Sequence, residues 1–459
     1  MGYFGEVYKR SGGNMKMSFL NRLRGAGKWM AVALTLAVLA AIVWLVVHFV
    51  LVPVIRDMEE DAVGHVYDFI VVGGGTSGSV VAARLSEEPL ISVLLLEAGG
   101  DGGSLISDVP MLNTLLFNGG MDWGYRTRPD GKSCLGMEGG ECLWHRGKVI
   151  GGTSVINAII YNRGHRDDYD FWESRGNYGW SFEELLPYFK KSEDFRDRVS
   201  ERDSAFHGKG GPLTVERARG PSILSELFFE AAGALGVPVT EDFSGEGQAM
   251  GVGLRHQTSR SGRRVSSANS FLAGAKNRTN LTILLGVQAQ KILLEKHRAK
   301  GVLVRQRNGR TRRFMAKREV ILSAGAVASP QLLMLSGIGP REHLDEVGVG
   351  DVVVDLPVGK NLQCHYGHSE PTFLIDKSVA PNPLFNALNP FNFLSYISHG
   401  SGPLRTAAGL EAVGFYRTGL HNESWPDVQV LMVSGHFGSD GGVSSARNFN
   451  LNKVQVKNR

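Results

Sequence analysis

The pattern of hydrophobic and polar positions divides the chain into two regions. Residues 30–52 form a continuous apolar run in which His48 is the one titratable side chain. At about 1.5 Å per residue, a helix over this run spans roughly 34 Å, which is long enough to cross a bilayer. From residue 65 onward, apolar segments are short and alternate with glycine-rich or polar stretches, as in a folded domain. The pattern therefore predicts a transmembrane anchor over residues 29–52, followed by a folded body.

Charge is distributed unevenly around the apolar run. Residues 1–28 contain six Lys or Arg and a single acidic residue, Glu6, so the remainder of the chain holds 44 basic and 44 acidic residues. The positive-inside rule then predicts a cytosolic tail over residues 1–28 and an extracellular or lumenal body. A secreted protein with a cleaved signal is the alternative, because Ala37, Ala40 and Ala41 are small residues that a peptidase can accept. Because the body is electrically balanced, the pI near 9.0 does not indicate a nucleic-acid partner.

Cysteine and glycosylation patterns agree with an extracellular or lumenal body. Cys134 and Cys142 have a glycine-rich segment between them, a spacing that a tight loop can close with a disulfide, although the spacing alone does not decide the pairing. Cys364 then has no partner, and is either buried or available for intermolecular pairing. Glycosylation sequons begin at Asn277, Asn280 and Asn422.

The body opens with the order of elements that binds a dinucleotide. Residues 67–72 form an apolar run rich in aromatic and β-branched side chains, which predicts a strand. Residues 79–85 predict a helix, and residues 91–96 predict a second strand that ends at Glu97. The glycines between the first strand and the helix have the GxGxxG spacing. The predicted phosphate-binding loop consists of Gly73, Gly74, Gly75, Thr76, Ser77 and Gly78.

Each element of this arrangement has a physical role. Gly73 allows the turn, Gly75 lets the backbone approach a pyrophosphate, and Gly78 allows the helix to pack closely on the strand. The start of the helix favours negative charge. Glu97 is expected to accept hydrogen bonds from the ribose hydroxyls of an adenosine. The motif itself does not distinguish NAD from FAD.

Two further segments carry a resemblance to a known family. Residues 147–157 (GKVIGGTSVIN) resemble the first signature of the glucose-methanol-choline (GMC) oxidoreductases, and residues 325–339 (GAVASPQLLMLSGIG) are similar to the second. The resemblance extends from about Tyr67 to about Gly442 and points to insect glucose dehydrogenase-like members. It implies FAD as the cofactor and a CH–OH group of a sugar or other alcohol as the substrate. It also implies a quinone or oxygen as the electron acceptor.

The resemblance also relates residues to regions of the cofactor. Val287 is implied to meet the adenine through its backbone, and Trp123 is either a neighbour of the flavin or a core aromatic residue. Independently, residues 151–152 place backbone with little bulk where a flat ring can lie against it. A helix entry capped by Thr153 or Ser154 is the alternative for this segment. The residues implied to line the isoalloxazine ring are Val149, Thr153, Asn157 and Ile160, and Gly152 is a further candidate for cofactor binding.

The order of elements predicts a two-lobe α/β (α+β) flavoprotein, in which a Rossmann-like FAD-binding domain is interleaved with a substrate domain built on an antiparallel sheet. Residues 281–294 and 302–314 alternate as strands, with a hairpin signal at Asn308-Gly309. Residues 319–323 predict a buried strand that rejoins the first sheet, and residues 427–433 predict a strand of the substrate domain. The predicted domains are a first FAD-binding segment (66–190), a substrate-domain insertion (191–275), a second FAD-binding segment (276–345) and an incomplete substrate domain (346–459).

Three other kinds of chemistry are disfavoured. His365 and His368 have HxxH spacing but lie where a loop is expected, so no metal site is predicted. Basic residues concentrate between positions 305 and 318, yet Phe314 is the one aromatic residue among them, which favours a solvated hairpin over a nucleic-acid surface. The GxSxG nucleophile elbow of hydrolases is absent from the sequence.

The catalytic base is the element of the family pattern that the sequence does not supply. The resemblance implies a histidine near the C-terminus, paired with a second histidine or an asparagine, but the sequence after Gly442 no longer resembles the family. His421 and His436 lie in a different context, so the catalytic residue is unassigned. We expect the chain to be incomplete or a short form and, as it stands, not to turn over alcohols. A catalytically inactive flavoprotein-like binding module is the alternative function.

Overall fold

A computed structural model describes most of the body of the chain. The described residues are 64–217, 222–245, 250–367, 372–373, 386, 389–420, 425–434 and 443–452. The predicted tail and anchor (residues 1–52) and the side chains of His368, His421, Asn422 and His436 therefore lie outside the described residues. Within the described ranges, no helix is both long enough and apolar enough to cross a membrane. All described strands belong to one compact unit, Val54–Gly102 with Ile106–Arg459.

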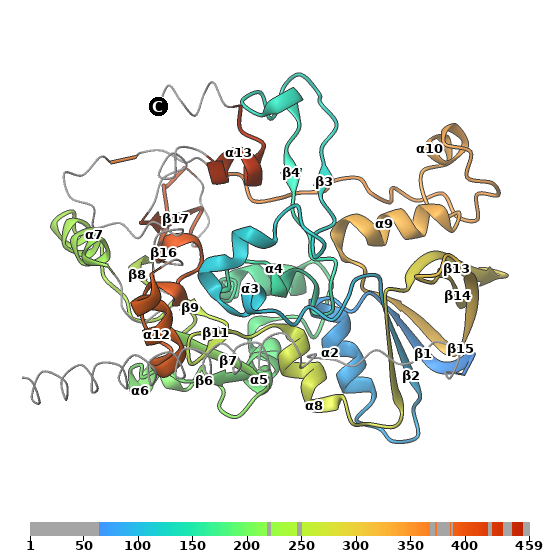
Figure 1. Cartoon of the computed structure of the whole chain (residues 1–459), viewed down its shortest axis with the longest axis horizontal. Helices are drawn as coiled ribbons and strands as arrows, with labels where there is room; N and C mark the ends of the chain where they lie inside the picture. Colours follow the sequence, from blue (N-terminus) through green and yellow to red (C-terminus); the bar gives the residue numbers. More distant parts are fainter. Residues whose placement is uncertain are drawn as a thin grey trace, which may run out of the picture. The chain divides into compact units, whose positions relative to one another are not determined.

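A six-stranded mixed sheet forms the first half of this unit (Figure 1). Four neighbouring strands are parallel to one another, and two further strands extend the sheet in antiparallel fashion. This is the Rossmann-like sheet that the alternation of strands and helix predicted, with an antiparallel extension. In spatial order the strands are β12 (Leu281–Leu285), β2 (Val93–Glu97), β1 (Val66–Val72), β15 (Thr311–Leu322), β14 (Arg298–Arg305) and β13 (Gln288–Glu295).

Strand β15 joins the two regions of the sheet. Its first half pairs antiparallel with β14, where Leu303 faces Arg313, and its second half pairs parallel with β1, where Ile70 faces Val320. The predicted strand over residues 319–323 that rejoins the first sheet is confirmed by its pairing with β1. It is the second half of β15 and not a separate strand, and it is half-buried where the prediction had it buried. The predicted hairpin is confirmed, with a connection longer than two residues in which Gly309 has a φ of 82°.

The segment 281–294 contains two strands on opposite edges of the sheet. The chain turns at Gly286, which has a φ of 71°, so β12 pairs with β2 while β13 pairs with β14. Positive φ is accessible to glycine at little cost, and a short alternating pattern does not reveal such a break. The prediction of one continuous alternating segment was therefore too simple.

Helices cover both faces of the parallel strands. Helix α2 (Thr76–Leu85) packs its small residues Ala82 and Ala83 against Val71 and Leu95. Helix α9 (Gly325–Leu335) places Leu332 in the cluster on the opposite face, which contains Ile70. Successive strand residues point to opposite faces, which explains why these buried strands are apolar throughout.

Two smaller sheets make up the second half of the unit. The predicted antiparallel sheet with a strand near residues 427–433 is confirmed, and a four-stranded sheet beside it contains one parallel pair, β6 with β7. The first consists of β17 (Val428–Val433), β16 (Leu410–Tyr416) and β8 (Gly251–Leu254), and the second of β5 (Ile160–Tyr161), β9 (His256–Gln257), β7 (Leu213–Arg217) and β6 (Glu193–Phe195). Short two-stranded ribbons pair β3 (Tyr125–Arg126) with β4 (Leu143–Trp144) and β10 (Ser259–Arg260) with β11 (Arg263–Arg264).

The remaining α-helices lie outside the sheets. They are α3 (Leu105–Asp108), α4 (Arg166–Ser174), α5 (Phe182–Ser192), α6 (Glu201–Ser204), α7 (Ile223–Ala234), α8 (Ala273–Ala275), α10 (Arg341–Glu346), α12 (Pro390–His399) and α13 (Val443–Phe449). Helices α4 and α5 both begin with a capping box, in which the side chain before the helix and an acidic side chain in the first turn satisfy each other's backbone N–H groups.

Cysteine and sequon positions refine the sequence predictions. Cys134 and Cys142 form a disulfide with a Cα–Cα distance of 5.6 Å, while Cys364 is exposed and free. Asn277 is exposed. The amide nitrogen of Asn280, in contrast, donates to the carbonyl oxygens of Glu88 and Ile91 at 2.9 and 2.8 Å. A glycan on Asn280 would break these bonds.

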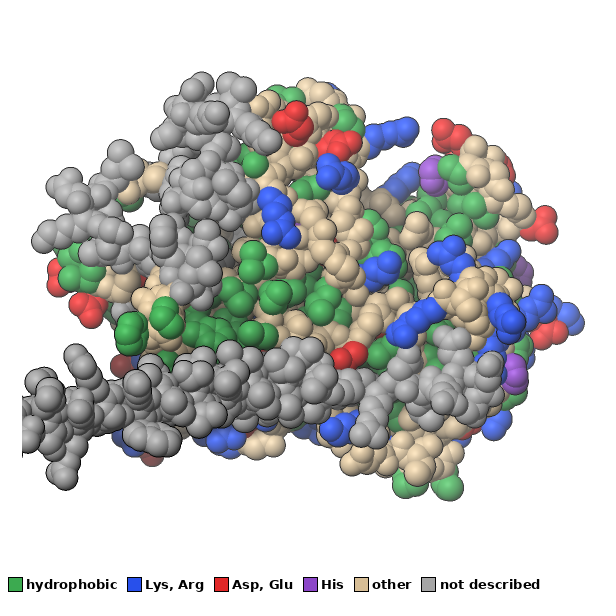
Figure 2. Space-filling model, in the orientation of Figure 1, with side chains coloured by type: hydrophobic (Ala, Val, Ile, Leu, Met, Phe, Trp, Pro, Cys, Tyr) green, Lys and Arg blue, Asp and Glu red, His purple; other side chains and the backbone are tan. Residues whose placement is uncertain are grey.

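Basic side chains gather on one side of the molecule. Figure 2 shows Lys and Arg on the surface over the β13–β15 region that Figure 1 labels. Most of these side chains are exposed, as expected for a solvated hairpin. They include Lys291, Lys296, Arg298, Arg305, Arg307, Arg310, Arg313, Lys317 and Arg318.

A buried ionic cluster holds the four-stranded sheet to its flanking loops. The ring of His207 lies between Glu193 and Asp242, with N–O distances of 3.1 and 2.8 Å, and Arg163 donates to Glu193 at 2.9 Å. Phe195 stacks on the His207 ring with 3.7 Å between centroids. Burial lowers the pKa of His207, but the hydrogen bonds to Asp242 and Glu193 outweigh burial and raise this pKa overall. Each carboxylate of the cluster therefore lies against a positively charged partner.

Replacing His207 by alanine should destabilise the protein. Two carboxylates would then stay buried without their common partner, at a cost of about 3–5 kcal/mol in the free energy of unfolding. Urea denaturation at neutral pH measures this cost. His343→Ala, at a half-exposed site on α10, is the control and should change stability by less than about 0.5 kcal/mol. Equal stability of the two variants would contradict a structural role for the cluster.

Candidate functional site

The loop between β1 and α2 contains glycines that the fold itself requires. Gly73 has a φ of 97°, and a Cβ atom added there would lie 2.5 Å from the carbonyl oxygen of Ser323. A Cβ on Gly78 would lie 1.9 Å from the carbonyl oxygen of Gly73. Both distances are far below van der Waals contact. The predicted roles of Gly73 in the turn and of Gly78 in the packing of helix on strand are therefore confirmed.

Gly75 differs from its neighbours. Its φ is −73°, which any residue can adopt, and an added Cβ would come no closer than 3.8 Å to another atom of the chain. The protein's own packing therefore does not require glycine at this position. Helix α2 begins at the next residue without a side-chain cap and without an acidic residue in its first turn, and Thr76 and Ser77 are exposed there. Free N–H groups and the positive end of the helix make this a place for an anion.

Glu97 lies at the end of β2 and is 6% exposed. One carboxylate oxygen accepts a hydrogen bond from the N–H of Gly74 at 2.9 Å, and the other accepts from Gly99 at 2.7 Å. Burial raises the pKa of Glu97 to about 7, although these two hydrogen bonds and the charge of Lys148 act in the opposite direction. The side chain thus ties the glycine loop of residues 73–78 to the end of the strand, a role the sequence prediction did not include.

Three backbone segments meet here: residues 73–75 of the loop, residues 99–100 and residues 147–152. We call these three segments together the glycine junction. The N–H of Gly151 donates to the carbonyl of Gly74 at 2.7 Å, and the N–H of Ile150 donates to Gly100 at 2.9 Å. A Cβ on Gly152 would lie 2.6 Å from the Cα of Gly75. Close contact between loops therefore accounts for glycine at position 152, whereas the sequence suggested only space for a flat ring.

The segment after the junction forms a short 3₁₀ helix, η5 (Gly152–Val155). The helix entry considered from the sequence is present, but the capping residue is Gly151, and neither Thr153 nor Ser154 caps it. Instead, the hydroxyl of Thr153 accepts a hydrogen bond from the N–H of Gly147 at 3.2 Å. The hydroxyl of Ser154 donates to the carbonyl of Gly151 at 2.6 Å.

The other residues implied by the resemblance occupy different environments. Val149 is buried, Asn157 is exposed, and Ile160 is half-buried in β5. The N–H of Val287 donates to the carbonyl of Glu97 at 2.9 Å, so a backbone contact with an adenine would use the Val287 carbonyl. Trp123 is half-buried, and the ammonium of Lys148 lies 4.7 Å from its ring centroid.

The structure brings most of the predicted residues to one place. The loop, Glu97, Val149, Gly152, Thr153 and Val287 are linked by the contacts described above, and Trp123 joins them through Lys148. Asn157 and Ile160 follow in the same chain segment. Sequence reasoning missed Gly99, Lys148 and a buried arginine, Arg264, that donates to Asn157 at 2.8 Å. The Gly-Gly pair after Glu97 was a usable signal, whereas nothing in the basic run around Arg264 set it apart.

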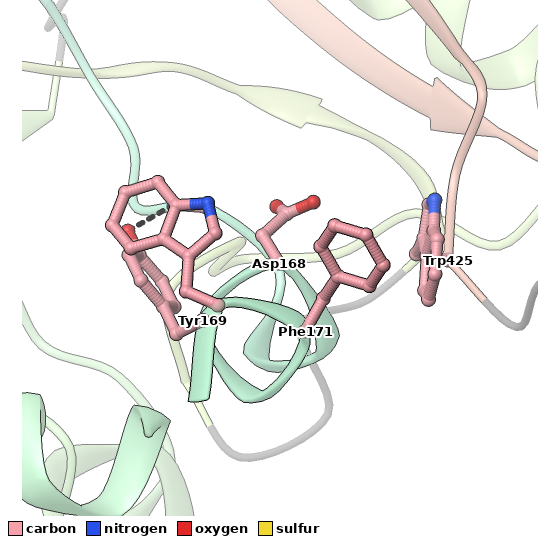
Figure 3. A pocket seen from close by; sticks show the side chains of 6 residues that line it. Asp168, Tyr169, Phe171 and Trp425 are labelled. Carbon is pink, nitrogen blue, oxygen red and sulfur yellow. Dashed lines mark hydrogen bonds between the residues drawn. The ribbon is translucent and has the colours of Figure 1, made fainter. Parts of the chain in front are cut away.

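A separate hollow is lined by residues of α4, by Gly164 before it, and by Trp425, which precedes strand β17. Figure 3 shows this hollow from close by. Phe171 lies between Asp168 and Trp425 in this view, and Tyr169 accepts a hydrogen bond from the N–H of Gly164. None of the lining residues belongs to the glycine junction. Among the described residues there is no group of three or more His, Cys, Asp or Glu that could hold a metal ion.

Comparison with known proteins identifies the family. The sequence profile of the GMC oxidoreductases matches residues 67–367, about two thirds of the chain. The chain therefore belongs to the GMC oxidoreductase family, and its fold is the α/β fold of those flavoproteins.

Individual relatives show how much of the family's length the chain shares. It is 43% identical over 339 residues to glucose dehydrogenase [FAD, quinone] of Drosophila melanogaster, covering 73% of this chain and 53% of that protein. It is 40% identical over 328 residues to oxygen-dependent choline dehydrogenase of Brucella anthropi, covering 71% and 57%. The crystal structure of pyridoxine 4-oxidase from Mesorbium loti superposes with a TM-score of 0.65 at 34% identity, covering 80% and 66%. The chain thus spans between about half and two thirds of the length of these relatives.

The raised pKa of Glu97 predicts a pH dependence of stability. The folded state holds the Glu97 proton up to a pH of about 7, whereas the unfolded chain releases it near 4.5, so the free energy of unfolding should fall as pH rises between these values. The contribution of Glu97 to this fall is up to about 3 kcal/mol. Denaturation of wild type and Glu97→Gln at pH 4.5 and 7.5 measures the free energy of unfolding of each protein. The contribution of Glu97 is the fall seen in wild type minus the fall seen in Glu97→Gln.

The exposed Glu295 provides the control for this experiment. Glu295→Gln should follow the wild-type pH dependence, because it makes the same change of side chain at an exposed site and leaves Glu97 in place. A Glu97→Gln variant with the same pH dependence as wild type would contradict a raised pKa of Glu97 in the folded state.

Proposed function

We propose that the glycine junction binds FAD. The observation that carries this proposal is Gly75, which the chain's own packing leaves free to be any residue, at the uncapped start of α2. A pyrophosphate lying against its backbone explains why this position is glycine. The names of the Drosophila relatives, which specify FAD, support the choice of this dinucleotide.

Other residues of the site take the remaining groups of the cofactor in this proposal. Glu97 accepts hydrogen bonds from the adenosine ribose, and Val287 meets the adenine through its carbonyl. Trp123 lies beside the ring system, where Lys148 adds positive charge. The isoalloxazine ring lies against Val149, Gly152, Thr153, Asn157 and Ile160. Strands from residues 66–97 and 281–322 share one sheet, which supports a discontinuous FAD-binding domain over 66–190 and 276–345. The substrate domain then covers 191–275 and 346–459.

The reaction we propose is oxidation of a CH–OH group of a sugar or other small alcohol, with a quinone or oxygen as the final electron acceptor. Bound FAD supplies the hydride acceptor for this chemistry. The chain contributes orientation: backbone at the glycine junction holds the cofactor, and the 149–160 segment forms the wall against which its ring lies. The relatives named for glucose with quinone and for choline with oxygen support this class of substrates and acceptors. Reduction of a quinone or a dye, compared with oxygen consumption, tests the acceptor.

Gly75→Ala should lower FAD content while leaving the fold intact. The added methyl group projects into the space we assign to the pyrophosphate and comes no closer than 3.8 Å to the chain, at the Cα of Gly152, which is an ordinary contact. We expect FAD affinity to fall by roughly 10-fold or more, since even a loss of about 1.4 kcal/mol has that effect. Flavin absorbance per mole of protein and FAD titration measure binding, and thermal unfolding of the cofactor-free protein measures stability.

Two other glycines serve as comparisons for Gly75. Gly78→Ala should lower both stability and FAD content, because its Cβ collides with the Gly73 carbonyl. Gly233→Ala, in α7 with open space around it, should leave FAD content unchanged and should not lower stability, because alanine favours a helix more than glycine does. Wild-type FAD affinity in Gly75→Ala would contradict the placement of the pyrophosphate, and a wild-type chain without affinity for FAD would contradict the proposed cofactor.

We also propose that residues 29–52 anchor the protein in a membrane, with residues 1–28 in the cytosol and the body extracellular or lumenal. The charge difference across the apolar run and the Cys134–Cys142 disulfide support this orientation. Expression with microsomes should give a protein that resists alkaline extraction and whose body is protected from protease. Of the two described sequons, Asn277 should carry a glycan and Asn280 should not, because the Asn280 amide is bonded to carbonyl groups of the chain.

Variants of the two sequons check this orientation. Asn277→Gln should remove glycosidase-sensitive mass, whereas Asn280→Gln should remove none. Protease protection of the N-terminal tail in sealed microsomes would contradict the proposed topology.

A further inference from the structure

Two buried arginines lie behind the segment that carries Asn157. Arg264 is 2% exposed, and its guanidinium donates to the carbonyls of Ser107 at 2.8 Å and Ser154 at 3.1 Å, and to Oδ1 of Asn157 at 2.8 Å. Arg255 is fully buried, donates to Leu410, and reaches the carbonyl of Ala158 at 3.5 Å. The Nη2 atom of each arginine is buried and has no acceptor among the described residues. Burying a guanidinium is costly, and the hydrogen bonds of Arg264 to Ser154 and Asn157 direct that buried group onto this one segment.

The contacts of Asn157 determine which way its amide points. Oδ1 accepts hydrogen bonds from two groups that can only donate, the guanidinium of Arg264 and the backbone N–H of Ile159 at 3.1 Å. The oxygen must therefore face these groups, and the amide NH₂ must face the other way. Asn157 is exposed, and its NH₂ makes no hydrogen bond to the described residues. The side chain presents a fixed, unused donor on the outer side of the segment.

The backbone at this point is strained. Ile159 is fully buried and has a φ of 54°, in the left-handed region that is unfavourable for a β-branched residue. Such a conformation is unfavourable and persists only where surrounding contacts impose it, often at functional sites. The bonds from Arg264 to Ser154 and Asn157, together with the N–H of Ile159, are contacts of this kind. The same contacts therefore hold both the strained backbone at Ile159 and the orientation of the Asn157 amide.

We propose that Arg264 is a positioning residue of the flavin site, which holds the Asn157 carboxamide so that its NH₂ donates to the bound flavin ring. This inference rests on the proposed FAD site, where the resemblance places Asn157 against the isoalloxazine. The acceptor atoms of the ring gain negative charge when it is reduced. A donor that is already oriented stabilises that charge without reorganisation. Arg264 thus makes the flavin more readily reduced without touching it.

Sulfite binding by the FAD-loaded full chain tests this inference without turnover. Sulfite adds to the oxidised ring and leaves negative charge on it, so its affinity reports how well the protein stabilises the reduced form. Loss of one hydrogen bond to a charged group costs about 1.5–3 kcal/mol, so Asn157→Ala and Arg264→Met should each weaken sulfite binding by roughly 10-fold or more. The double variant should be no weaker than the single variants, because Arg264 acts through Asn157.

The controls separate positioning from stability and from charge. Arg405→Met removes another buried arginine, paired with Glu216 at 2.7 Å, and should lower thermal stability while sulfite affinity stays at the wild-type value. If Arg264→Met does not fold, Arg264→Lys keeps a buried cation without the planar fork that contacts Ser154 and Asn157 together, and should still weaken sulfite binding. Asn157→Asp keeps the acceptor for Arg264, loses the amide donor and adds a negative charge, so it should weaken sulfite binding in a folded protein, and Arg264→Lys is the variant that separates positioning from charge.

The outcomes distinguish a failure of the proposed FAD site from a failure of the role inferred for Arg264. If the losses of sulfite affinity in the two single variants multiply in the double variant, Arg264 acts through its own charge and the inference is overturned. Wild-type sulfite affinity in Asn157→Asp or in a folded Arg264→Lys would overturn it as well. A wild-type chain that fails to bind FAD would overturn the proposed function together with this inference. Normal FAD affinity with unchanged sulfite affinity in the variants would overturn the inference alone.

Discussion

The structure depends on the close approach of backbone segments at the glycine junction. Gly78 lies against Gly73, Gly152 lies against Gly75, and Gly99 lies against Lys148, in each case closer than a Cβ atom would permit. These contacts bring the end of β2, the start of α2 and the 147–152 segment to one point. The site residues then need no long side chains to converge, because the backbone itself has already converged. Gly75 stands out because it alone among these is not explained by contacts within the chain.

Buried charged groups stabilise this junction and its continuation. Glu97 accepts from two backbone N–H groups, and Arg264 donates to two carbonyls and an amide. Removing either group from water is unfavourable, and burial therefore raises the pKa of Glu97 to about 7 and lowers the pKa of Arg264 to about 10. Glu97 lies beside the glycine loop of residues 73–78, and Arg264 lies behind Asn157. The energetic cost of burial and the proposed role in the site thus belong to the same residues.

The long strand β15 explains how distant segments of the chain form one domain. One half of β15 belongs to an antiparallel hairpin, and the other half inserts beside β1 in a parallel arrangement. The chain then continues into α9, which covers the face of the sheet opposite α2. Residues between β2 and β12, together with β16 and β17 from the chain after α9, form the smaller sheets without interrupting the central sheet. The site lies where this inserted region returns to the ends of the parallel strands.

Local patterns in the sequence determined the strand, glycine loop and helix of residues 66–85, the acidic residue at the end of β2 and the family. These features depend on residues close together in the chain, where apolar runs and glycine spacing report directly on backbone geometry. Tertiary structure alone decided that residues 311–322 form one strand, that Gly286 separates two strands on opposite edges, and that Gly152 is required by contact with Gly75. It also decided that Arg264 lies against Asn157, more than 100 residues earlier in the chain. Such contacts join segments whose separation in sequence carries no pattern, because only the packing of the whole sheet brings them within hydrogen-bonding distance.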